Sequence, residues 1–449
     1  MKAIRVPSRL IRVLPVVLYV FLSTSYLFTI PTGESPDEPS HLQCIEQVTQ
    51  HNRIPIIDPL PGGDIWWARE RIISGLVCAH MPLYYFLTGY TQRIVQRISG
   101  VPTHYEFPPN DPEWETGQSK AMFTHPHRDS FLTLSEPASL LILRIESMLL
   151  GLVSVLGAYQ ITRRIAPNSS HAATIAMTLV AGWPQFLFMS RAISNDALAV
   201  ALAVGVLIVL LEIGKPYRFV LASVLAALAT LSKLTMVFSA GTIVLAFALE
   251  FAASRERSAY LRAGIVSVGV FGSLGALLFL QPTLLSHLEW SRATMAGINP
   301  AVCTVTYWLD VLHASVQSGW ARFGWMNVLT PDVQAYTWWS AIVLTGAAGV
   351  YAGIHRSSSR KTRLAVIVAC VWLLSFLLAY LRINMNRFQP QFRYIFPIAP
   401  VLAAFSATGL SVIGRPFERL KPVAVPVVAV FLLLANLWII FNVVVPAYS

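Results

Sequence analysis

Long apolar stretches recur along most of the chain, with short polar connections between them. A helix needs about 20 mostly apolar residues to cross a bilayer, so each such stretch predicts one transmembrane helix. Eleven segments qualify, at residues 11–30, 139–162, 172–190, 197–213, 218–232, 235–252, 263–281, 336–354, 364–381, 394–412 and 423–446. The pattern predicts an all-α polytopic membrane protein in which residues 1–449 form one domain.

Two long polar segments interrupt this pattern, at residues 31–138 and 282–335. The first segment contains two helical patterns that make poor membrane spans. Residues 39–50 carry their apolar side chains on one face, and residues 82–98 are apolar in the first half and basic in the second. Both suit a position at the membrane surface rather than across it.

The charged residues are few and unevenly placed. Of the 449 residues, 55% are hydrophobic and 12% charged, and 33 Lys and Arg against 22 Asp and Glu give a formal charge of +11. More than half of the basic residues fall in alternate connections between the predicted spans. By the positive-inside rule these connections are cytoplasmic, which puts the amino terminus inside and both long polar segments outside. Topology therefore accounts for the positive charge, and nucleic acid is not an expected partner.

The first apolar stretch follows a basic amino terminus, as in a secretory signal peptide. Thr29-Ile30-Pro31 stands where a small-residue cleavage site would be expected, so the stretch predicts a retained anchor.

Cysteine and histidine usage narrows the possible chemistry. Four cysteines without a C-x-x-C pair exclude a disulfide-rich scaffold and a thiolate zinc site. A bridge between Cys44 and Cys78 stays open, because both lie in a predicted outer segment where disulfides persist. Metal-binding residue types recur there without a diagnostic spacing, at His104, His125, His127 and Asp129. The sequence identifies no cofactor with certainty, and a divalent cation stays open.

Two acids stand directly after the first predicted span, in Ser35-Pro36-Asp37-Glu38-Pro39. Proline suits the first turn of a helix, so Asp37 falls at a helix amino terminus. The free N–H groups and the dipole there favour an ionised carboxylate, as a general base requires. The alternative is that Asp37 only caps the helix.

A second group of polar residues is predicted on the same membrane face. Asp196 lies in a short connection after Arg191, where it serves either the site or a simple helix cap. Basic or donor side chains gather on this face as well, at His80, Arg144, Arg191, Lys233 and Arg393. Snorkelling explains any one of them, whereas several together suit an anionic headgroup, because guanidinium groups bind phosphate oxygens bidentately.

Aromatic residues mark the second outer segment, in Trp320-Ala321-Arg322-Phe323-Gly324-Trp325. An aromatic belt at the membrane boundary is one explanation. Contact with a sugar ring or an acceptor is the other.

The ordered motifs of the chain resemble a bacterial family of uncharacterised predicted membrane proteins that belongs to the GT-C glycosyltransferase superfamily. The resemblance covers about residues 30–400. It rests on Pro36-Asp37-Glu38-Pro39-Ser40-His41, His80-Met81-Pro82-Leu83-Tyr84-Tyr85, Leu143-Arg144-Ile145-Glu146-Ser147, Pro184-Gln185-Phe186 with Ser194-Asn195-Asp196-Ala197-Leu198, Arg322-Phe323-Gly324-Trp325 and Gln391-Phe392-Arg393-Tyr394-Ile395-Phe396-Pro397.

The resemblance implies a GT-C bundle that moves a sugar from a polyprenyl-phosphate carrier to a glycan, lipid or protein acceptor outside the membrane. In relatives such as the aminoarabinose and protein mannosyltransferases, the acid after the first span is catalytic, a role that falls here on Asp37 with Glu38 beside it. The second acid of those relatives falls near Asp196. Where they carry a lysine that approaches the carrier phosphate, this chain has His80.

The resemblance also implies an inverting single displacement. Asp37 would take the proton of the acceptor hydroxyl, and Arg191, Arg393 and Lys233 would stabilise the leaving phosphate. Contacts to the sugar or acceptor would come from His41, Trp320, Arg322, Trp325 and Tyr394.

Three other functions use the same features. A transporter or flippase of a lipid-linked or anionic substrate would use the basic cavity without chemistry. A polysaccharide polymerase or ligase would use a pyrophosphate-linked donor. A scaffold protein would no longer use the catalytic residues. The expected location is the cytoplasmic (inner) membrane of a bacterium, with membrane lipids as partners.

Overall fold

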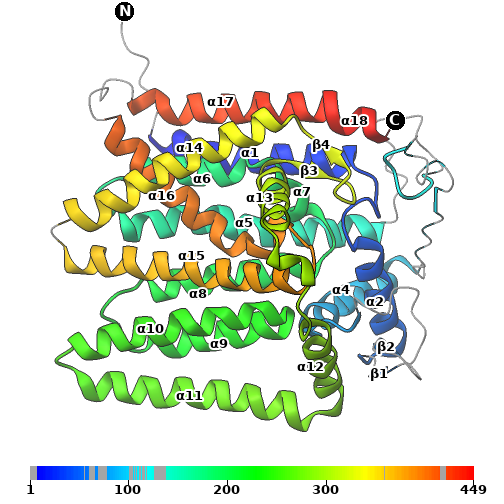
Figure 1. The fold of residues 1–449 in the computed structure, drawn as a ribbon, viewed down its shortest axis with the longest axis horizontal. Coiled ribbons are helices and arrows are strands. Elements are labelled where there is room, and N and C mark those ends of the chain that lie inside the picture. Colours follow the sequence, from blue (N-terminus) through cyan, green and yellow to red (C-terminus); the bar gives the residue numbers. More distant parts are fainter. Residues whose placement is uncertain are drawn as a thin grey trace, which may run out of the picture.

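The computed structural model describes most of the chain. The described residues are 8–54, 56–59, 66–68, 78–100, 105, 107, 109, 110, 113, 117, 119–125, 138–357, 359–414 and 421–448. Nearly all of them are helical, and the long helices lie side by side in one bundle (Figure 1). The prediction of an all-α polytopic fold is confirmed.

Eight helices in the described part of the chain are long and apolar enough to cross a membrane. The eight helices are α1 (Ser8–Thr29), α5 (Ala138–Ile165), α10 (Phe238–Ala253), α11 (Arg257–Leu280), α14 (Asp332–Tyr351), α15 (Arg360–Asn386), α16 (Ala399–Ile413) and α17 (Lys421–Ile439). Four of these spans include a short turn of 3-10 or π helix at one end. The turn η1 (Leu234–Val237) precedes α10 and η4 (Phe392–Ile398) precedes α16, whereas η3 (Ala352–Arg356) follows α14, and η6 (Ile440–Val444) with α18 (Val445–Tyr448) follows α17.

The predicted count of eleven spans is not confirmed. The predicted span 172–190 is two helices, α6 (Ser170–Ala181) and α7 (Pro184–Arg191), with a bend of 62° between them. Pro184 has no N–H to continue the ladder, which explains the break. The helices α8 (Asn195–Leu210) and α9 (Arg218–Ser232) have 16 and 15 residues, fewer than the roughly 20 that a bilayer requires.

Both predicted surface helices are present after α1. They are α2 (Glu38–His51) and α4 (Leu83–Ser99), which pack against each other, and neither is among the candidate spans. A disulfide joins Cys44 on α2 to Cys78, which fulfils the pairing left open from the sequence. A two-stranded sheet of β1 (Ile57–Pro59) and β2 (Trp66–Ala68) lies beside them, with Ile57 paired to Ala68.

The second long polar segment also folds at this end of the bundle (Figure 1). It contains α12 (Pro282–Met295), the short η2 (Pro300–Cys303), α13 (Val305–Trp320) and an antiparallel hairpin of β3 (Arg322–Phe323) and β4 (Val328–Leu329). The segments after α1 and after α11 therefore meet, as the alternation of spans requires.

Three of the connections predicted to be cytoplasmic contact one another away from these outer segments. Glu212 accepts hydrogen bonds from Arg164 at 2.9 Å and from Lys215 at 2.7 Å, which joins the end of α5 to the turn between α8 and α9. Close by in sequence, the buried Arg218 pairs with Glu250. These contacts agree with one shared side for the basic connections.

The helices α14 and α16 touch along their backbones. Gly349 and Gly409 face each other, and an added Cβ at either would overlap a carbonyl oxygen of the opposite helix, at Phe405 or Thr345. Small residues allow such close approach between membrane helices. This contact fixes α16, whose amino end carries η4 into the site described below.

We expect Gly349→Ala to lower the free energy of unfolding by about 1–3 kcal/mol, because the methyl group must displace the α16 backbone. Thermal unfolding of the purified protein measures this change. The matched control is Gly346→Ala on the same helix, where an added Cβ meets nothing within 4 Å. That variant should be neutral or slightly more stable, and equal losses in both variants would contradict the packing argument.

Candidate functional site

The turn between α1 and α2 separates two adjacent acids. Asp37 has a left-handed backbone conformation (φ 65°) and its side chain makes no capping hydrogen bond to α2. Helix capping, the alternative left open from the sequence, is therefore not the role of the Asp37 side chain. The carboxylate of Asp37 is 39% exposed, whereas the next residue, Glu38, is fully buried.

Asp37 pairs with an arginine from the far end of the chain. Arg393 donates from Nη2 to Asp37 Oδ2 at 2.5 Å and from Nη1 to the carbonyl of Pro36 at 3.1 Å. The arginine is only 4% exposed, and it lies in η4 directly before α16. Burial raises the pKa of Asp37, but the charge and hydrogen bond of Arg393, together with the nearby His41 and His80, outweigh burial and lower that pKa to about 2. Asp37 is therefore an ionised carboxylate with one open side.

A second acid and base pair lies in the same cluster. Asp196, in the first turn of α8, pairs with Lys233 at the carboxyl end of α9. Tyr394 joins the two pairs, because the Lys233 ammonium lies 4.8 Å and the Arg393 guanidinium 5.2 Å from the centre of its ring. Five residues expected at the site from the sequence, Asp37, Asp196, Lys233, Arg393 and Tyr394, thus form one connected group.

Two histidines lie next to this group and are neutral. His41 on α2 shares a 2.9 Å hydrogen bond with the hydroxyl of Tyr85 and stacks on its ring. The carbonyl of His80 accepts a 2.9 Å hydrogen bond from the ring of His287, and its own ring meets Trp290 edge-on. Burial lowers the pKa of His41 to about 4 and that of His80 to about 3.

The other expected acid and two of the expected arginines are buried around the turn. Glu38 accepts two hydrogen bonds from Arg144, at 3.3 and 3.2 Å, and two more from the backbone N–H groups of Gly33 and Ile193. Arg191 donates to Ser35 at 2.8 Å and to the carbonyl of Ile30 at 3.4 Å. None of the three side chains is exposed, so they hold the turn rather than face an open site.

The β3–β4 hairpin closes over the same turn. Trp325 donates from its indole to the carbonyl of Gly33 at 3.1 Å, and Arg322 donates to the carbonyl of Met326 at 2.6 Å within the hairpin. Trp320 is only 4% exposed and packs on Trp338, with ring centres 4.8 Å apart. Its burial leaves no ring face for the sugar contact considered from the sequence, and the same burial excludes a place in an aromatic belt.

Two further residues shape the site, although the sequence assigned neither of them a role. Glu34 is buried and accepts hydrogen bonds from the backbone of Met122 and Phe123 and from His125, at 3.1, 3.1 and 2.8 Å. Gln185 accepts from the backbone N–H of Arg322 at 2.6 Å. The position of Glu34, three residues before Asp37, was the feature of the sequence that could have indicated its place at the site.

Within the described residues no group of three His, Cys, Asp or Glu side chains could hold a metal ion. Of the four metal-binding candidates in the sequence, His125 is bound to Glu34, and His104, His127 and Asp129 lie outside the described residues. The two acids of the cluster, Asp37 and Asp196, both have cationic partners.

The fold is similar to that of two solved membrane glycosyltransferases. ArnT from Cupriavidus metallidurans bound to undecaprenyl phosphate is 12% identical, with a TM-score of 0.55, over 97% of this chain and 73% of ArnT. The archaeal oligosaccharyltransferase AglB from Archaeoglobus fulgidus, in complex with an inhibitory peptide and a dolichol-phosphate, is 14% identical with a TM-score of 0.53. That match covers 97% of this chain, which spans about half (55%) of AglB. The fold is thus the GT-C fold.

Sequence comparison gives a family. No curated protein matches the chain. The profile of a family described as predicted membrane protein, DUF2142, matches residues 130–402. This range includes Asp196, Lys233 and Arg393 but not Asp37, and it covers more than half of the chain. The chain therefore belongs to the DUF2142 family of predicted membrane proteins, with the fold of the GT-C glycosyltransferases.

Proposed function

We propose that the protein is an inverting glycosyltransferase that moves a sugar from a polyprenyl-phosphate carrier to an acceptor hydroxyl. The observation that carries the proposal is the half-open carboxylate of Asp37, held in a cluster with Arg393, Lys233 and Asp196. A base with an open side next to buried cations suits the attack of a hydroxyl at a carbon that loses a phosphate.

The similar structures support the donor class. ArnT was solved with undecaprenyl phosphate and AglB with a dolichol-phosphate, both polyprenyl-type phosphates. In this chain Arg393 and Lys233 are the cations of the cluster that share Tyr394, and we assign them to the donor phosphate. His80 is neutral, so it would donate a hydrogen bond rather than a charge.

The proposed reaction is one displacement. The acceptor oxygen attacks the anomeric carbon and its proton passes to Asp37, while the bond from carbon to the phosphate oxygen breaks and its electrons remain on polyprenyl phosphate. Attack from the face opposite the leaving group inverts the anomeric centre. Arg393 and Lys233 stabilise the charge that develops on the phosphate, and partial burial strengthens this effect.

The low pKa of Asp37 makes it a weak base while Arg393 is its partner. A donor phosphate that attracts the Arg393 guanidinium would weaken this pair and raise the pKa of Asp37 toward its ordinary value. In this proposal the donor itself activates the base. Glu38, Arg144 and Arg191 are positioning residues, because each is buried around the turn that carries Asp37.

The transporter alternative has less support. Transporters bind substrates near mid-membrane at broken helices. The broken helix pair of this chain, α6 with α7, contributes neither acid of the cluster: Asp37 lies before α2 and Asp196 in the first turn of α8. Such a position at the edge of the bundle suits an acceptor that arrives from water.

We expect Asp37→Asn to lower the transfer rate by about 10²–10⁴-fold, because the amide cannot accept the hydroxyl proton. Purified protein in liposomes would be offered a panel of radiolabelled polyprenyl-phosphate sugars, with release of label from the carrier as the readout. Glu289→Gln, an exposed acid on α12, is the matched control and should turn over normally. Normal turnover by Asp37→Asn in a folded protein would remove Asp37 from the reaction.

The pH dependence of transfer tests the pairing of Asp37 with Arg393. With the pKa of Asp37 at about 2, the carboxylate stays ionised on acidification, so kcat/KM should be flat from pH 7 to pH 4.5. Arg393→Gln removes the charge that opposes the effect of burial on the pKa of Asp37. The activity that remains in this variant should therefore begin to fall at a higher pH than that of the wild type. Lys233→Gln, which removes the cation beside Asp196, should leave the profile flat. A wild-type profile that falls between pH 7 and pH 5 would exclude this pairing.

We also propose that the site faces the outside of a bacterial inner membrane, which the cysteines can test. Cys303 is free and exposed in the second long polar segment, and Cys370 is half-buried in α15. A membrane-impermeant maleimide should label Cys303 in spheroplasts as fully as in lysed cells, and Cys303→Ser should abolish that labelling. Labelling of Cys303 only after lysis would reverse the orientation.

A further inference from the structure

A polar cavity opens beside α13, on the other side of the segment that leads into Arg393. Its volume is about 580 Å³, within the range of roughly 300–1,000 Å³ typical of ligand pockets. Seven of its lining residues carry polar or aromatic side chains, namely Asp310, His313, Gln317, Arg322, Thr330, Asp332 and Phe388. They come from α13, the β3–β4 hairpin, the start of α14 and the segment after α15.

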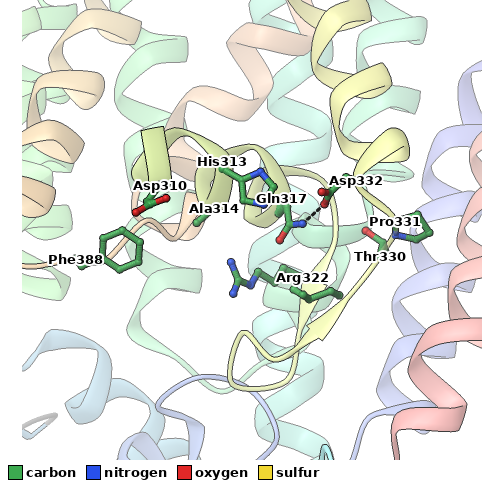
Figure 2. Close-up of a pocket in the computed structure, with 10 residues that line it drawn as sticks. Asp310, His313, Ala314, Gln317, Arg322, Thr330, Pro331, Asp332 and Phe388 are labelled. Carbon is green, nitrogen blue, oxygen red and sulfur yellow. Dashed lines mark hydrogen bonds between the residues drawn. The ribbon is translucent and has the colours of Figure 1, made fainter. Parts of the chain in front are cut away.

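The polar groups of this cavity face one space. His313, Gln317 and Thr330 have hydrogen-bond partners in the protein, whereas Asp310 and the end of the Arg322 guanidinium keep bonding capacity for a ligand. Figure 2 shows the Arg322 guanidinium extending into the space below α13, with the Phe388 ring at one side and Gln317 bonded to Asp332. Arg322 bonds through Nε to the carbonyl of Met326, and neither Arg322 nor Asp310 forms an ion pair within the described part of the chain. Donors and acceptors therefore face the cavity with bonding capacity to spare.

The cavity and the Asp37 cluster share one wall. Phe388 begins the segment that ends at Tyr394, and the hydroxyl of Tyr394 donates to Gln389 at 2.5 Å. Ser318 on α13 clamps this segment, since it donates to the carbonyl of Pro390 at 2.8 Å and accepts from the N–H of Phe392 at 3.0 Å. A ligand in the cavity would therefore contact the segment that positions Arg393.

We propose that this cavity is the acceptor subsite and that it binds a neutral oligosaccharide. The inference rests on the proposed glycosyltransferase function. Two carboxylates and a glutamine accept and donate hydrogen bonds to sugar hydroxyls, a guanidinium donates two more, and the Phe388 ring offers an apolar face to the C–H side of a pyranose. The lining carries two carboxylates, Asp310 and Asp332, against one guanidinium, that of Arg322, so its negative balance disfavours uronic acids and phosphates and selects against acidic glycans.

The test measures binding of fluorescently labelled hexasaccharides to the full chain in nanodiscs, by fluorescence polarisation. The probes are hexasaccharides of glucose, mannose and galactose, with a galacturonic acid hexasaccharide as the acidic comparison. At least one neutral probe should bind, and the acidic probe should bind at least tenfold more weakly. Binding of none of the neutral probes, or tighter binding of the acidic probe, would overturn the proposal.

Variants identify the cavity as the binding site. Asp310→Asn and Phe388→Ala should each weaken binding of the neutral probe by about tenfold or more. The matched controls are Glu289→Gln on α12 and Leu309→Ala, an exposed side chain on α13 that does not line the cavity. Wild-type affinity in both cavity variants, with their thermal unfolding unchanged, would place the sugar elsewhere.

The two proposals fail separately. Turnover of the donor that does not depend on Asp37 would end the glycosyltransferase proposal, whatever binds in the cavity. Turnover that depends on Asp37, together with sugar binding that ignores Asp310 and Phe388, would end the acceptor proposal alone.

Discussion

Charges buried at the end of an apolar bundle must be paired, and this constraint organises the whole site. An unpaired ion removed from water costs several kcal/mol, and removal of one partner of a buried pair typically costs 3–5 kcal/mol. The chain meets this constraint with pairs between segments that are distant in sequence, Asp37 with Arg393, Glu38 with Arg144 and Asp196 with Lys233. Each pair fixes the place of one element, so the same contacts that neutralise the charges also assemble the cluster.

These pairs differ in exposure, and the difference divides their roles. Glu38 and Arg144 are both sealed from solvent, so their pair can only support the turn. Asp37 is 39% exposed while its partner is 4% exposed, so the arginine is held by the protein and the carboxylate can meet a ligand. A rigid buried partner for a reactive group is how a scaffold keeps a site in position.

The sequence predicted much of the bundle and part of the site. Hydropathy located the long helices, and the alternation of basic connections brought Asp37 and Asp196 to one face before any contact was known. Only the resemblance separated Asp37 from Glu38, because the left-handed backbone at Asp37 and the burial of Glu38 depend on the folded turn. The sequence could not tell that Arg191 and Trp320 are buried, since burial depends on tertiary neighbours such as Ser35 and Trp338. Pro184 is itself a signal of a helix break, but it lies within a continuous apolar run that was interpreted as one span.

The pair between Asp37 and Arg393 spans 356 positions of the chain, and Tyr26 on α1 likewise bonds to Asn436 on α17 at a separation of 410. Synthesis and insertion proceed from the amino terminus, so α1 enters the membrane long before its partners exist. The acid at the site must then wait, without its cation, until the 356 positions that separate it from Arg393 have been made. Closure of α1 against α17 thus follows the insertion of the helices between them, and the site forms only once the segment that carries Arg393 has been added.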